Sequence, residues 1–84
     1  MDEHEQIELG MYCDTLLRDD NFNTLVAVCE KNFALTILEQ EDSKERSKTY
    51  YTYQGLKSLL EVMQQFVINK DQIAANAEQE KETE

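Results

Sequence analysis

Apolar residues recur at steps of three and four along most of the chain, a spacing that places them on one side of a helix. The pattern predicts three helices, over about residues 3–18, 21–40 and 42–69. The breaks between them are short polar runs, and Asp20 and Asp42 stand where the N-caps of the second and third helices are expected. The sequence therefore predicts an all-α chain.

The third helix carries two apolar stripes side by side. One stripe repeats at heptad-like spacing and consists of Tyr53, Leu56, Leu60, Met63 and Val67. The other consists of Leu59, Val62, Phe66 and Ile73. Since two stripes need two neighbours, we expect the second and third helices to form an antiparallel hairpin, with the shorter first helix laid across it as a three-helix unit. A unit this small buries too little apolar area to be very stable alone, so it is expected to oligomerise.

The second stripe is the expected protein-interaction surface. Tyr51 points away from the core side of the helix and is expected to be an exposed aromatic anchor, whereas Tyr50 and Tyr53 are expected to pack inside. The residues predicted to contact a partner are Tyr51, Leu59, Val62, Phe66 and Ile73.

Composition adds a charge layout to this picture. The 84 residues include no Pro and only two Gly, so long helices are not interrupted, and residues 1–84 are expected to be one small domain. Residues 74–84 form an acidic tail expected to be helical to about residue 78. The net charge of −10 gathers at the two ends, which argues against direct contact with nucleic-acid phosphates or anionic membranes.

No group of residues suggests catalysis, a cofactor or a metal. His4 is the only histidine and has only carboxylates such as Glu5 and Glu8 beside it, so a solvated terminus is the simpler interpretation. Cys13 and Cys29 lie in apolar stripes and are interpreted as buried free thiols. With no signal-peptide pattern and no membrane span, we expect a non-enzymatic, soluble protein of a reducing compartment.

Two features leave alternatives open. An acidic face including Glu8, Asp14, Asp19 and Asp20 is able to imitate the phosphates of DNA, so the chain is alternatively an acidic inhibitor of a host nucleic-acid enzyme. The basic cluster of Lys44, Arg46 and Lys48 beside tyrosines suggests, as a further alternative, a DNA-packaging accessory. Interleaved acids weaken the field of that cluster, and direct nucleic-acid binding is not favoured.

The spacing of the apolar residues also resembles a known group of proteins. Leu16-Leu17 is followed by Phe22 at the start of a helix, and Arg46 then precedes Tyr50 or Tyr53 and the pair Leu59-Leu60. Over about residues 16–67 this pattern resembles small helical proteins that tailed bacteriophages encode near their head and portal genes. Such proteins often have Pro where Asn21 stands here. The resemblance implies a virion or assembly component, in the virion or the host cytoplasm, that associates with itself or with another phage structural protein.

Overall fold

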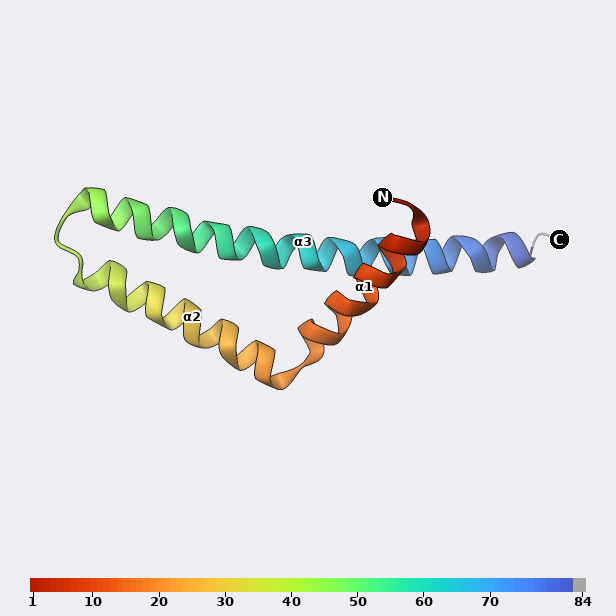
Figure 1. The fold of residues 1–84 in the computed structure, drawn as a ribbon, viewed down its shortest axis with the longest axis horizontal. Helices are drawn as coiled ribbons and strands as arrows, with labels where there is room; N and C mark the ends of the chain where they lie inside the picture. Colours follow the sequence, from red (N-terminus) through yellow and green to blue (C-terminus); the bar gives the residue numbers. More distant parts are fainter. Residues whose placement is uncertain (83–84) are drawn as a thin grey trace.

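The chain is a set of helices laid out in one plane. The computed structural model describes residues 1–82, which form α1 (Glu3–Arg18), α2 (Asp20–Glu39) and α3 (Ser43–Glu82) and contain no strand (Figure 1). This confirms the all-α prediction. With 40 residues α3 is about 60 Å long at 1.5 Å per residue, and it dominates the 65 Å long axis of the molecule. The helix thus continues past residue 78, and residues 83–84 of the acidic tail lie outside the described part.

Aspartates cap the helix starts. The Oδ1 atom of Asp2 accepts a hydrogen bond from the Glu5 backbone N–H in α1, and that of Asp19 accepts one from the Phe22 N–H in α2, each at 2.8 Å. The prediction of Asp20 as the second cap was therefore wrong by one residue. The reason is that the chain turns within Asp19 alone, which ends α1 and caps α2, so Asp20 is already helical. Asp42 caps α3 as predicted, accepting from the Lys44 N–H at 2.8 Å.

α1 crosses α3 at a short distance because of Gly10. Gly10 is buried, and a Cβ atom placed there would lie 2.7 Å from the carbonyl oxygen of Phe66 and 2.7 Å from Cβ of Lys70. A glycine that weakens the isolated helix therefore allows the two backbones to approach. In Figure 1, α1, α2 and the first two thirds of α3 form the three sides of a triangle, and α3 runs on beyond the crossing.

An ion pair links α1 and α3 beside this crossing. The Lys70 Nζ atom lies 2.9 Å from Oδ1 of Asp71 and 3.8 Å from Oδ2 of Asp14, and Asp14 also bonds the Arg18 guanidinium at 2.8 Å. The hydrogen bond to Asp71 raises the pKa of Lys70 above its ordinary value of 10.5, and the charges of Asp71 and Asp14 act in the same direction. Lys70 is therefore held in its charged form at the crossing.

Contact between α2 and α3 is lighter. Phe33 meets the ring of Tyr53 edge to face, with centroids 5.7 Å apart, and the Thr49 hydroxyl donates to Oε1 of Gln40 at 2.9 Å. Yet no residue of α2 is buried. Tyr50, which was expected to pack inside, is instead 51% exposed and lies edge-on to Tyr51, because α2 covers the start of α3 only in part.

The chain accordingly buries few side chains. Among the described side chains, Cys13 and Met63 are the only buried hydrophobic ones. The chain exposes 6754 Å² of surface, whereas a compact globular chain of this mass exposes about 5,200 Å². Its radius of gyration is 18.1 Å, against about 12 Å for a compact domain of this length. The single chain therefore leaves much apolar surface uncovered.

Candidate interaction surface

An apolar groove runs between α1 and α3. It has a volume of about 340 Å³ and is lined by uncharged side chains from all three helices. α1 contributes Leu9, Tyr12, Cys13 and Leu16, α2 contributes Phe22, and α3 contributes Leu59, Val62, Met63 and Phe66. Cys13 and Met63 form its floor, because they are the buried members, while Tyr12, Leu59 and Val62 remain exposed on its walls.

Three of the five predicted interaction residues meet in this groove. Leu59 and Val62 are 56% and 52% exposed, and Phe66 is half-buried against α1. Tyr51 is 72% exposed and lies nearer the α2–α3 loop, whereas Ile73 is half-buried on the other side of the crossing. All five are on α3, but the structure brings only the middle three into one hollow.

Sequence reasoning missed the contribution of α1 to this surface. Leu9 and Tyr12 were not among the predicted interaction residues, yet they stand exposed on the groove wall. Gly10 between them is the signal that was available, because an isolated glycine inside a helical pattern often marks a close backbone approach. A close crossing at Gly10 leaves the residues on either side of it at the edge of the contact.

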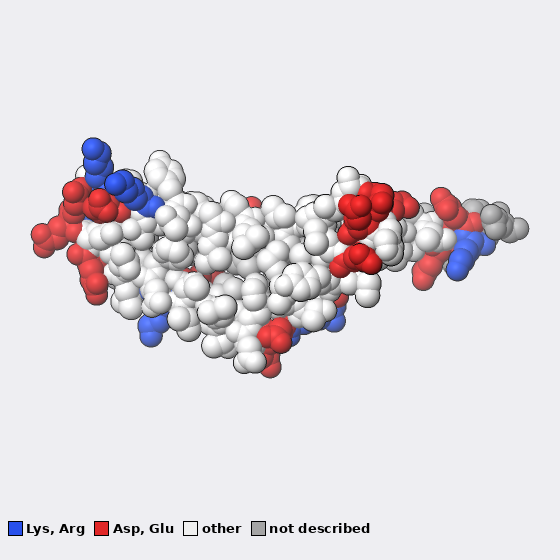
Figure 2. All heavy atoms as spheres, in the orientation of Figure 1, with Lys and Arg blue, Asp and Glu red and all other residues white. Residues whose placement is uncertain are grey.

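Charge is distributed so that the apolar surface stays neutral. Figure 2 shows a broad uncharged region across the middle of this face, with acidic and basic side chains toward the two ends of the molecule and at its lower edge. Burying such a region removes few charges from water, so the main electrostatic cost of association is avoided. The surface is thus suited to contact with another protein.

The predicted acidic face is largely engaged within the chain. Asp14 pairs with Arg18 and Lys70, Asp19 caps α2, and Oε1 of Glu8 lies 3.1 Å from Nε2 of His4. Asp20 is the exposed acid in the first turn of α2. Three of the four carboxylates therefore have partners within the chain, and the acidic face stays a prediction.

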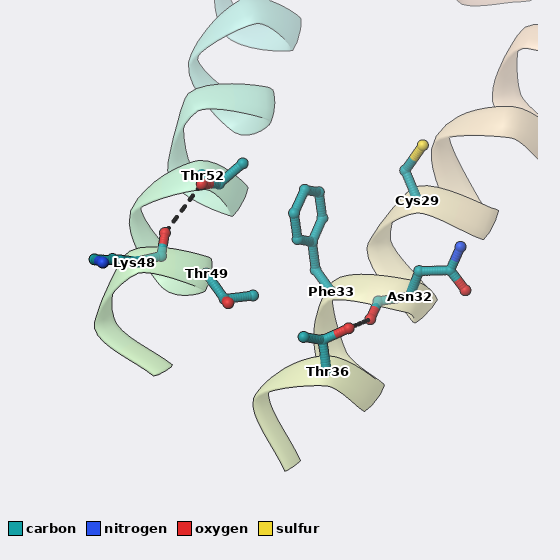
Figure 3. Close-up of a pocket in the computed structure, with 7 residues that line it drawn as sticks. All are labelled: Cys29, Asn32, Phe33, Thr36, Lys48, Thr49 and Thr52. Atoms are coloured by element: carbon teal, nitrogen blue, oxygen red, sulfur yellow. Dashed lines mark hydrogen bonds between the residues drawn. The ribbon is translucent and has the colours of Figure 1, made fainter. Parts of the chain in front are cut away.

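A second hollow of about 440 Å³ lies between α2 and α3 near their loop, with Phe33 reaching across it (Figure 3). Its hydroxyl groups serve the helices, since Thr36 and Thr52 donate to the carbonyl oxygens of Asn32 and Lys48. Cys29 on its wall is a free thiol that is half-buried, so the expected burial was only partly right. Cys13 is free and buried, as expected.

The basic cluster is also engaged locally. The Arg46 guanidinium donates to the carbonyl oxygen of Glu41 at 3.2 Å, and Lys48 Nζ lies 3.6 Å from Oε1 of Glu45.

Within residues 1–82, no three metal-ligating side chains come together, and no helix has an apolar stretch of the length needed to cross a bilayer. No protein-family model, curated protein or solved structure matches this chain.

Proposed function

We propose that this chain is a non-enzymatic structural protein that acts by helix-mediated association. The observation that supports it is the excess of exposed surface, about 1,600 Å² above that of a compact chain, much of it apolar and uncharged. Monomeric proteins rarely expose continuous apolar patches of more than a few hundred Å², and larger ones mark interaction sites.

In this proposal α2 and α3 act as an antiparallel hairpin, and the groove between α1 and α3 is the centre of the contact. The Phe33–Tyr53 ring contact and the Thr49–Gln40 hydrogen bond support the hairpin, because both join α2 or its end to the start of α3. The resemblance described above extends the proposal to a virion or assembly component of a tailed bacteriophage. The chain would then associate with itself or with another head or tail protein.

The test is the solution mass of the purified protein by light scattering at low and high salt. We expect an assembly of two or more chains whose mass is unchanged or larger at high salt, because apolar contacts are not screened. A chain that stays monomeric at micromolar concentrations contradicts self-association. If that monomer also captures a nucleic-acid enzyme only at low salt, the acidic-inhibitor alternative replaces this proposal.

A further inference from the structure

The exposed stripe of α3 has a symmetry that a single chain does not use. At about 100° per residue, one set of α3 residues lies within about −20° to +60° of Val62 around the helix axis, at steps of three, four, seven or eight along the chain. From the start of the helix to its end they include Lys44, Tyr51, Leu59, Val62, Phe66, Ile73 and Glu80. We call this set the α3 stripe.

Val62 lies at the middle of the α3 stripe. Lys44 and Glu80 are each 18 positions from it, and Tyr51 and Ile73 are each 11 positions from it. Leu59 and Phe66 flank it at three and four positions. When the helix is reversed about Val62, Tyr51 falls opposite Ile73 and Lys44 falls opposite Glu80, while Leu59 and Phe66 come within one position of each other.

We propose that a second copy of this chain docks on the α3 stripe, with the two α3 helices antiparallel and a twofold axis beside Val62. This inference rests on the proposed function and specifies its partner and its geometry. The two Val62 side chains then face each other, Tyr51 packs on Ile73 of the second copy, and the walls formed by Leu9 and Tyr12 flank the pair.

The area available favours a second copy of the chain. A stable dimer of standard size buries about 800 Å² on each partner, and the excess surface of this chain is about 1,600 Å². The excess exposed surface is therefore large enough for one helix pair along the α3 stripe. The uncharged middle of the molecule also lets two copies approach there despite a net charge of −10 on each.

Charge selects the antiparallel direction. Lys44 stands in the first turn of α3 and Glu80 stands near its end, both on the α3 stripe. Antiparallel pairing about Val62 brings these opposite charges together twice, and it also sets the two helix dipoles in opposite directions. Parallel pairing would place Lys44 against Lys44 and Glu80 against Glu80.

Gly55 gives an independent indication. A glycine inside a helix costs about 1 kcal/mol relative to alanine. Within one chain nothing requires it, because a Cβ atom at Gly55 would meet no atom within 4 Å. Gly55 lies between Tyr51 and Leu59 on the α3 stripe, opposite Asn69 in the antiparallel pair, where the missing side chain lets the second backbone approach.

The decisive experiment uses opposite charges at the proposed twofold axis. We expect Val62→Asp and Val62→Lys each to raise the dissociation constant about 100-fold or more, since each places two like charges against each other in an apolar contact. An equimolar mixture of the two variants is expected to re-associate into mixed pairs. Ile68→Asp and Ile68→Lys are the matched controls and should leave the mass unchanged, because Ile68 is on the same helix at 49% exposure, off the stripe.

The outcomes distinguish failure of the pairing from failure of the proposed function. Failure of the mixture to re-associate, or an assembly that survives Val62→Asp, overturns the pairing while the proposed function stands. A wild-type chain that is monomeric contradicts the pairing and the self-association in the proposed function. Any helicity lost on separation should return in the mixture, so partial unfolding of the single variants leaves the test intact.

The relative direction of the two α3 helices is determined by disulfide crosslinking in a chain that carries Cys13→Ala and Cys29→Ala. Antiparallel pairing predicts that Tyr51→Cys mixed with Ile73→Cys crosslinks between the two variants and that neither variant crosslinks with itself. A parallel pair gives the reverse pattern and overturns the antiparallel geometry.

Discussion

Replacing Gly10 by alanine should loosen the docking of α1 on α3. The added Cβ would lie 2.7 Å from the Phe66 carbonyl oxygen and from Lys70 Cβ, whereas ordinary contacts are 3.4–4 Å, so the helices must separate by about 0.7 Å. Both opposing atoms are fixed by the backbone of α3 and cannot rotate away. Overpacking of this kind costs about 1–3 kcal/mol, which raises the undocked population roughly 5- to 150-fold.

The assay is the rate at which Cys13 reacts with a thiol reagent. Cys13 is 6% exposed beneath the α1–α3 contact, so it reacts only when α1 undocks. Cys29 is half-buried on α2 and serves as an internal reference in the same molecule. We expect Gly10→Ala to accelerate labelling of Cys13 by the factor above and to leave the rate at Cys29 unchanged.

Gly55→Ala is the matched control, because its new methyl group meets nothing within 4 Å in the single chain. Measured in the Val62→Asp background, where chains are expected to be separate, it should leave Cys13 labelling unchanged. It should also raise thermal stability by about 0.5–1 kcal/mol through helix propensity. If Gly10→Ala behaves in the same way as Gly55→Ala, with protected Cys13 and higher stability, the close crossing at Gly10 is refuted.

Three further predictions concern caps, charge and packing. Asp19→Ala should lower stability toward urea by about 1 kcal/mol and Asp20→Ala by clearly less, and equal losses would contradict the assigned cap. The pKa of Lys70 is raised in the folded state, so the stability that its charge contributes is present below pH 10.5 and is lost as pH rises through the folded pKa. The melting temperature should therefore fall more steeply at high pH in the wild type than in Lys70→Gln. Phe33→Ala should cost roughly 1–2 kcal/mol by loss of its edge-to-face ring contact, and the exposed Leu35→Ala much less, in thermal denaturation.

The helices themselves were predictable from local pattern. Helical periodicity placed the first helix at residues 3–18, where the structure has it, and the capping aspartate of α3 was found because Asp before a helical run has a direct hydrogen-bonding role. Periodicity alone supported the third helix only to about residue 69, because the residues after Ile73 lose the apolar repeat. The intrinsic propensity of Ala, Glu and Gln extended the prediction to about residue 78, and α3 runs to Glu82.

Packing was less accessible, because it depends on how far apart the helices lie. Position on the helix correctly placed Tyr53 in the contact with α2. It also placed Tyr50 inside, but α2 covers only part of the circumference of α3 and leaves Tyr50 exposed. By helix propensity alone Gly10 is unfavourable, because the benefit of a missing side chain appears only when a second backbone is within reach. The groove could not be located until that crossing was known.

The proposed α3 pair leaves a second apolar surface, and this bears on what the assembly becomes. Leu25, Val28 and Leu35 recur at steps of three and seven on α2 and are each about half exposed, and the still more exposed Leu38 lies near the end of the same helix. None of them belongs to the α3 stripe, so an isologous dimer about Val62 does not cover them. A twofold contact uses the same patch on both chains and closes on itself, whereas growth beyond a dimer requires a second, different contact. The α2 surface is available for that contact. A dimer formed through α3 carries one such surface on each chain. These two α2 surfaces then determine whether the dimer joins further copies or another structural protein.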